Sequence, residues 1–215
     1  MNSFLHIISV YKSDTSWVNK LTAPYIFYYK TNCEHPKNHP YTNINICGAE
    51  TNILKYIIDF YENLPDICVF THPYNIKWTH PGNLYDNINN LYMNSETLGD
   101  FGPIHKDCPR YQAQDKVYYN LMKESGFYDK NLKAYFGEMP DKYSLGKIST
   151  SQFFVRKNTI RRLPKKFYLD LYNWLINNSI PNTLYLRDNP FNEFWTSRYM
   201  EWSWHFIFTT PLINC

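Results

Sequence analysis

The sequence lacks the features that mark several specialised protein classes. Its five cysteines are odd in number and contain no Cys-x-x-Cys pair, so neither a disulfide framework nor a zinc ribbon is indicated. No apolar stretch approaches the roughly 20 residues that a membrane span needs, and no basic region precedes the short apolar run near the N-terminus. We therefore expect a soluble, cytoplasmic protein, and 215 residues predict one domain over residues 1–215.

Clustered charge is also scarce. The 22 basic and 19 acidic residues give a net charge of +3 and are spread along the chain, whereas a nucleic-acid binder gathers its basic residues in a patch or stripe. The basic segment from Arg156 to Lys166 is interpreted as a solvated face, with phosphate contact as the alternative. We therefore expect no nucleic-acid partner. Aromatic residues, by contrast, make up 19% of the chain; most are expected in the core, although Tyr and Trp also suit stacking on sugars or nucleobases.

The stretch from Asn45 to His80 predicts a turn, a helix, a strand and a polar loop. Gly48 can adopt a positive φ, and Glu50 or Thr51 then opens a helix with apolar residues at helical spacing. Pro65 disfavours helical geometry in the residue before it and so ends the helix. The following apolar run, Ile67 to Phe70, has the length of a buried strand. The polar loop after it lies where an open α/β sheet places its ligands.

The rest of the chain alternates strands with helices. Further strands are expected over Phe4–Val10, Pro24–Tyr29 and Lys147–Val155. Helices are expected over Gly82–Tyr92, around Val117–Met122, over Ile160–Leu175 and in the last element, Phe194–Phe208. The segment Tyr135–Leu145 is interpreted as irregular. This order predicts an α/β domain with a Rossmann-like, mainly parallel or mixed central sheet and helices on both faces.

Polar residues that follow the predicted strands are candidate ligand contacts. Tyr11 follows the first strand and could stack on a base. Ser13 or Asp14 is expected to cap the next short helix. His72 follows the buried strand, where it could donate to a phosphate, join a metal site or be merely structural. Ser151 and Gln152, with neighbouring hydroxyls, are predicted on a strand edge that suits sugar recognition.

Four segments occur in an order that resembles a known family. They read VYKSDTSW, then GAE with YENLPDICVFTH, then STSQFFVRKNTIRRLPKKFYLDLYNWL, and EWSWHFIF. They are similar to the ordered blocks of a little-characterised family of small soluble domains related to GT-A glycosyltransferases. The resemblance implies a nucleotide-diphosphate sugar as donor, held near the ends of the early strands, and a carbohydrate or glycan acceptor in a cleft built from later segments. Donor contacts are then expected from Tyr11, Asp14, Glu50 and His72, and acceptor contacts from Ser151 and Gln152.

The resemblance leaves the metal open. Many GT-A enzymes follow a central strand with Asp-x-Asp, which holds Mg or Mn, whereas this chain has Thr71-His72-Pro73. The glycine turn of the family usually reads Gly-Arg-Glu, and Ala49 stands here between Gly48 and Glu50. Mn or Mg is therefore a possible cofactor that no Asp-x-Asp motif supports.

Glycosyl transfer requires a base for the acceptor hydroxyl, and Glu201 is the candidate. It lies in an apolar, aromatic segment, where desolvation would raise its pKa, and His205 lies one turn further on. The alternatives are a helix N-terminal carboxylate and a structural i,i+4 pair with His205. Glu50, likewise, could serve only to stabilise a helix dipole. Lower-ranked candidate bases are Asp141 and Glu138.

Three other functions stay open. The first is a non-catalytic module that binds nucleotide sugars or carbohydrate on the same fold. The second is a metal-dependent hydrolase using His72, His80, His105 and Asp107, whose spacing matches no known ligand set. A separate metal pair at His35 and His39 is disfavoured because prolines interrupt any helix that would align them. The third is a structural or interaction protein with an aromatic surface.

Overall fold

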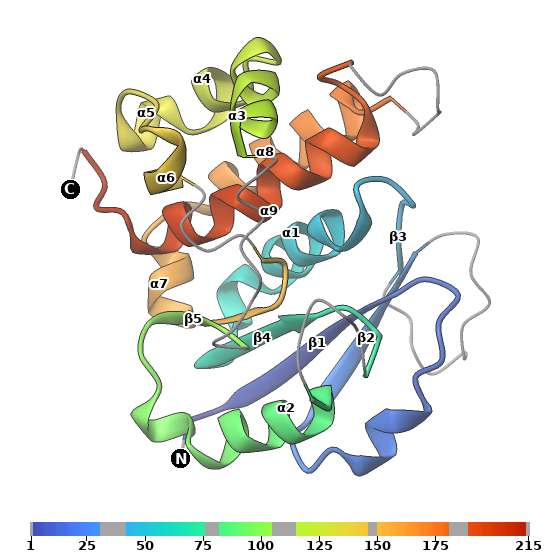
Figure 1. The fold of residues 1–215 in the computed structure, drawn as a ribbon. Helices are drawn as coiled ribbons and strands as arrows, with labels where there is room; N and C mark the ends of the chain where they lie inside the picture. The colour runs from blue at the N-terminus through green and yellow to red at the C-terminus, as the bar shows by residue number, and fades with distance from the viewer. Residues whose placement is uncertain are drawn as a thin grey trace.

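A six-stranded mixed sheet forms the centre of the protein (Figure 1). The computed structural model describes residues 2–30, 42–75, 82–104, 115–145, 150–180 and 189–213. The strand order is β3-β2-β1-β4-β6-β5. The strands are β1 Phe4–Val10, β2 Tyr25–Lys30, β3 Thr42–Asn43, β4 Ile67–Thr71, β5 Phe101–Pro103 and β6 Phe153–Arg156. The first four in sequence pair in parallel, and β6 runs antiparallel to both β4 and β5.

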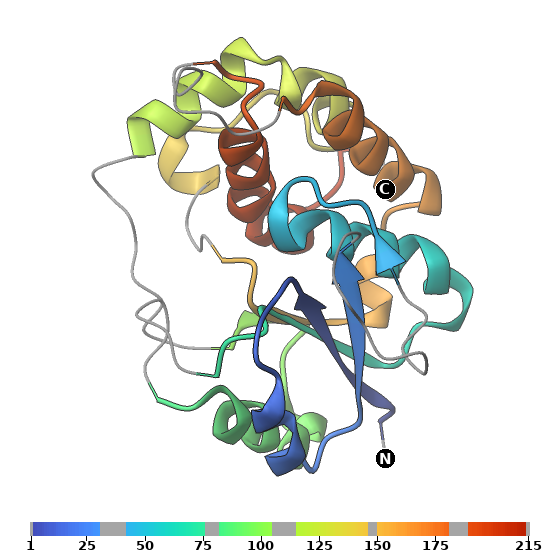
Figure 2. The ribbon, with the colours of Figure 1, turned by 90° about the vertical axis from the view of Figure 1, so that its right-hand side faces the viewer.

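Helices cover both faces of this sheet. One face packs against α1 Gly48–Phe60, α8 Lys165–Asn178 and α9 Glu193–Thr209, and the other against α2 Leu84–Met93 and the 3-10 helix η1 Ser16–Lys20 (Figures 1 and 2). Successive strand residues alternate between the two cores: Ile7 faces α1, and Ile8 faces the α2 side. The remaining elements are η2 Tyr61–Asn63, η3 Ser95–Thr97, α3 Asp115–Glu124, α4 Phe127–Asn131, α5 Lys133–Phe136, α6 Lys142–Leu145 and α7 Lys157–Arg161.

The predicted fold class is confirmed. The strands expected over Phe4–Val10, Pro24–Tyr29 and Ile67–Phe70 are β1, β2 and β4, and the predicted glycine turn leads into α1. Gly48 has φ +53°, as does Cys47 before it, so the chain enters α1 through two consecutive left-handed residues. None of the described helices is both long and apolar enough to cross a membrane.

Two local predictions are wrong. The strand expected over Lys147–Val155 begins only at Phe153, because the Thr150 hydroxyl accepts from the Gln152 amide (3.0 Å) and so replaces a ladder bond with a local one. Part of that segment, residues 146–149, lies outside the described residues. The segment expected to be irregular over Tyr135–Leu145 contains the end of α5 and all of α6. Asp141 caps α6, since its carboxylate accepts from the Ser144 amide at 3.2 Å and the Ser144 hydroxyl at 2.7 Å.

Candidate functional site

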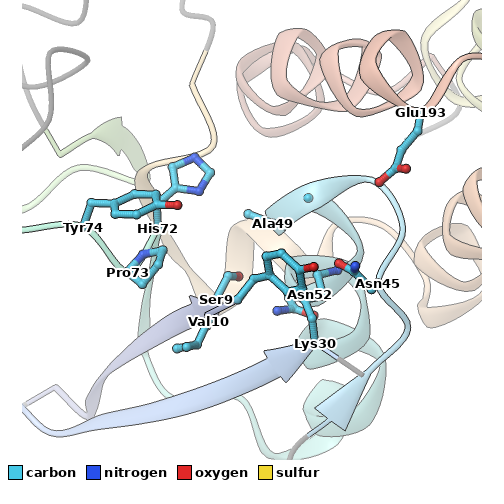
Figure 3. A pocket seen from close by; sticks show the side chains of 12 residues that line it. Ser9, Val10, Lys30, Asn45, Ala49, Asn52, His72, Pro73, Tyr74 and Glu193 are labelled. Atoms are coloured by element: carbon cyan, nitrogen blue, oxygen red, sulfur yellow. The ribbon is translucent and has the colours of Figure 1, made fainter. Parts of the chain in front are cut away.

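A cavity of about 400 Å³ lies at the carboxyl ends of β1, β2 and β4 (Figure 3). The strand order reverses at β1, because β2 and β3 follow on one side of it and β4 is added on the other. Open α/β sheets bind ligands at such a topological switch point. We call this cavity the switch-point pocket. It is lined by Ser9, Val10, Tyr11, Lys30, Asn45, Gly48, Ala49, Asn52, His72, Pro73, Tyr74 and Glu193.

A buried lysine supplies positive charge to the switch-point pocket. Lys30 is the last residue of β2 and is only 3% exposed. Its ammonium group donates to the carbonyl oxygens of Ile44 (3.2 Å) and Ile46 (3.3 Å) and to the Thr51 hydroxyl (2.5 Å). These acceptors stabilise the charged form of a group that burial alone would disfavour.

The start of α1 forms a second electropositive wall. Gly48 and Ala49 line the pocket, and the free amides and dipole of a helix start favour an anion. A carboxylate of the protein already lies there: Glu193, from the start of α9, accepts from the Cys47 amide at 2.9 Å (Figure 3). A phosphate bound at this wall would share it with Glu193 or displace it.

The third wall is the His72-Pro73-Tyr74 segment after β4. Two buried side chains hold it from below: Trp17 donates to the Pro73 carbonyl (2.7 Å), and His6 Nε2 lies 2.7 Å from the Thr71 hydroxyl. Burial lowers the pKa of His6 to about 3, so this imidazole is neutral at physiological pH. The wall is therefore positioned by hydrogen bonds that bring no charge into the pocket.

The four predicted donor contacts separate into two groups. Tyr11 and His72 line the switch-point pocket. Asp14 does not; its carboxylate accepts from the amide (2.8 Å) and hydroxyl (3.0 Å) of Ser16, bonds that lower its pKa. Asp14 thus has the capping role expected of Ser13 or Asp14. Glu50 lies outside the pocket lining, although it follows the pocket residue Ala49.

Glu50 is instead buried between α1, α9 and the segment before β6. It is 3% exposed; Ser151 Oγ donates to one carboxyl oxygen, and Trp204 Nε1 donates to the other at 2.5 Å. Burial raises the pKa of Glu50 to about 8 and the nearby Glu201 raises it further, against the opposing hydrogen bonds and Arg198. Glu50 is therefore mostly a neutral carboxylic acid at pH 7.

The predicted catalytic residues lie on α9. Glu201 has a side chain 15% exposed and forms an ion pair with Arg198, one turn earlier. His205 Nε2 lies 3.5 Å from the Thr209 hydroxyl, and its ring contacts Phe101 with centroids 5.7 Å apart. The i,i+3 partner Arg198 was missed because both Arg198 and His205 have helical spacing from Glu201.

The predicted acceptor contacts are also buried. Ser151 and Gln152 are 3% and 5% exposed and precede β6, so their placement on a strand edge is wrong. The Ser151 hydroxyl is bonded to Glu50, and Gln152 Oε1 has no hydrogen-bond partner among the described residues. Neither side chain lines the switch-point pocket.

The lower-ranked carboxylates have structural partners. Asp141 caps α6, as described above, and Glu138 forms an ion pair with Lys133 (2.9 Å) on the surface. The described part of the chain holds no group of three His, Cys, Asp or Glu residues arranged for a metal. The residues of the hydrolase and metal-pair hypotheses that lie outside the described residues are His35, His39, His80, His105 and Asp107.

The sequence analysis missed four polar residues of the pocket: Lys30, Asn45, Asn52 and Glu193. Lys30 carried a usable signal, because it ends a strand that was predicted parallel to β1, and such strands place their carboxyl ends at one edge. Glu193 carried none, since its contact with Cys47 spans 146 residues.

Fold and pocket together define an open α/β domain with a ligand-sized cavity at its switch point. A family profile matches residues 5–215, and the chain belongs to that family, described as a protein of unknown function, DUF3431. No curated protein matches the chain. No solved structure matches it either.

Proposed function

We propose that the protein is a glycosyltransferase that moves a sugar from a nucleotide-diphosphate donor to a hydroxyl acceptor, with the donor in the switch-point pocket. The observation that carries the proposal is the combination, in one cavity, of the Lys30 ammonium and the start of α1. A volume of about 400 Å³ is within the usual range of small-molecule sites.

The walls of the pocket suggest how the donor lies. The diphosphate would meet Lys30 and the first amides of α1, where positive charge is concentrated. Tyr11 and Tyr74, 42% and 41% exposed, offer aromatic faces at the rim for a base. His72 lies at the wall nearest the segment before β6 and would contact the sugar or the leaving diphosphate.

Glu201 is the proposed base in this scheme. Its carboxylate would take the proton of the acceptor hydroxyl as the sugar carbon leaves the diphosphate oxygen. Arg198 would orient that carboxylate through their ion pair. The described residues do not provide a ligand set for Mn or Mg, so no step of the scheme uses a metal.

A non-catalytic nucleotide-sugar module is the second candidate. One observation favours it: Glu193, which lines the pocket, is bonded to the Cys47 amide, and Glu201 is not part of the pocket lining. Such a module would bind the donor in the same way but would not cleave it.

Thermal-shift measurements with UDP, GDP, UDP-glucose and GDP-mannose, with and without Mn, test the proposal. A ligand at 100 times its Kd should stabilise the fold by about 2.7 kcal/mol. Stabilisation with release of the nucleoside diphosphate supports the transferase, and stabilisation without release supports the module. Stabilisation by Mn alone would favour the hydrolase, and no stabilisation by any nucleotide would contradict both leading candidates.

A further inference from the structure

Three segments that are distant in sequence meet at the buried Glu50 side chain. Glu50 lies in the first turn of α1, Ser151 in the segment before β6, and Trp204 in the second half of α9. The two hydrogen bonds from Ser151 and Trp204 span 101 and 154 residues. Glu50 thus bridges the two elements that pack beside the start of α1.

The same residue is connected to the switch-point pocket on two sides. Through the backbone it follows Gly48 and Ala49, which line the pocket. Through Ser151 it reaches the His72 wall, because the β4–β6 register that pairs Phe70 with Phe153 places His72 opposite Ser151 when it is continued by two residues.

Glu50 is also close to the proposed base. The charge of Glu201 contributes to raising the pKa of Glu50, and Arg198 acts in the opposite direction. Two carboxyl groups and one guanidinium therefore share this region. With Glu50 holding a proton, the negative charge of the pair rests on Glu201, opposite Arg198.

We propose that Glu50 is a positioning residue of the transferase: by bridging Ser151 and Trp204 it holds α9, with Glu201, in register with the His72 wall of the pocket. The catalytic consequence rests on the proposed function. The bridge itself is a structural property that can be tested without it.

Substitutions at both ends of the bridge separate positioning from general stability. Gln is close to an isostere of the neutral acid: its oxygen can accept from Trp204 and its amide can donate to Ser151. Glu50→Gln should therefore retain turnover within about twofold. Glu50→Ala and Ser151→Ala should lower kcat about 10- to 100-fold, the usual cost of misplacing a reacting group by about 1 Å, with KM for the donor nearly unchanged. Glu62→Gln, on an exposed side chain next to α1, is the matched control and should behave as wild type.

The inference is overturned if Glu50→Ala and Ser151→Ala turn over donor at the wild-type rate, or if Glu50→Gln loses as much activity as Glu50→Ala. If Glu50→Ala does not fold, Ser151→Ala decides. If the wild type binds none of the four nucleotides, the proposed function fails, and hydrogen exchange of the α9 amides then tests the bridge alone. Faster exchange in Glu50→Ala than in Glu50→Gln supports it; equal exchange refutes it.

Discussion

Two glutamates approach the start of α1 from opposite sides, and their surroundings differ. Glu193 lines the switch-point pocket and accepts a hydrogen bond from a backbone amide, that of Cys47. Glu50 is buried and is bonded to two side chains, those of Ser151 and Trp204. The helix dipole acts on both carboxyl groups, yet burial keeps Glu50 mostly protonated at pH 7.

The comparison teaches that the first turn of α1 separates a polar pocket from a dry contact. On the pocket side the helix start is open to an anion, which the protein itself now supplies. On the dry side an acid without charge joins two elements. Ligand binding is thus expected to depend on the Glu193 side, and alignment of α9 on the Glu50 side.

The largest expected effect is on turnover, through the carboxylate next to Glu50. Glu201→Gln keeps the shape of the side chain but removes its basicity, so turnover should fall about 10²- to 10⁴-fold while donor affinity barely changes. It should also bring the pKa of Glu50 closer to its ordinary value, since the charge that raises it is gone.

A paired variant separates catalysis from structure at Glu201. His205→Gln should leave turnover much closer to wild type, as measured by nucleoside diphosphate release. Similar losses in both variants, with a lower melting temperature, would indicate that Glu201 acts through helix packing. Unchanged turnover in well-folded Glu201→Gln would contradict its assignment as base.

The second effect is a pH dependence of stability that one of the two glutamates supplies. The pKa of Glu50 is raised from 4.5 to about 8 in the folded protein, so between these values the folded state holds a proton that the unfolded state has lost. Its stabilising contribution is complete below pH 4.5 and is lost as the pH rises through 8. The slope should be about 1.4 kcal/mol per pH unit in this window.

Urea unfolding from pH 5 to 8 measures this slope in variants. Glu50→Gln should remove it, because the amide does not titrate, whereas Glu193→Gln should retain it. Identical slopes in the wild type and Glu50→Gln would show that Glu50 is not the group responsible.

Much of the fold follows from local sequence, and most of the site does not. Strands β1, β2 and β4 and helix α1 are encoded in short apolar runs and their spacing, which act within one element. Tyr11 and His72 were found because each directly follows such a strand. The character of Glu50 was not, because it is set by partners 101 and 154 residues away, and helix position alone predicts only a charged residue on a dipole.

The third effect compares alanine at the two glutamates at pH 6, where Glu50 is neutral. Glu50→Ala leaves the Trp204 indole N–H and the Ser151 hydroxyl without their partner in a buried place, so the free energy of unfolding should fall by about 2–5 kcal/mol. Glu193→Ala removes one bond at a helix start and should cost about 1 kcal/mol. Equal losses in urea unfolding would contradict the distinction between the dry and the pocket side.

The smallest effect is on affinity. Glu193→Gln removes a negative charge from the pocket while keeping an acceptor for the Cys47 amide, so UDP or GDP should bind about fivefold more tightly, close to 1 kcal/mol. The gain should shrink at high salt. Unchanged affinity over a salt series would place the diphosphate away from the start of α1.

Calorimetric titration of the wild type and Lys30→Met with UDP-glucose and GDP-mannose tests the central claim most directly, with uridine and guanosine as controls. If the switch-point pocket holds the diphosphate of a nucleotide sugar, one donor should bind per chain. The nucleosides should bind far more weakly, and Lys30→Met should lose about tenfold or more in donor affinity, through the lost charge-assisted contact. Absence of donor binding at millimolar concentration, or equal binding to wild type and a folded Lys30→Met, would contradict the claim.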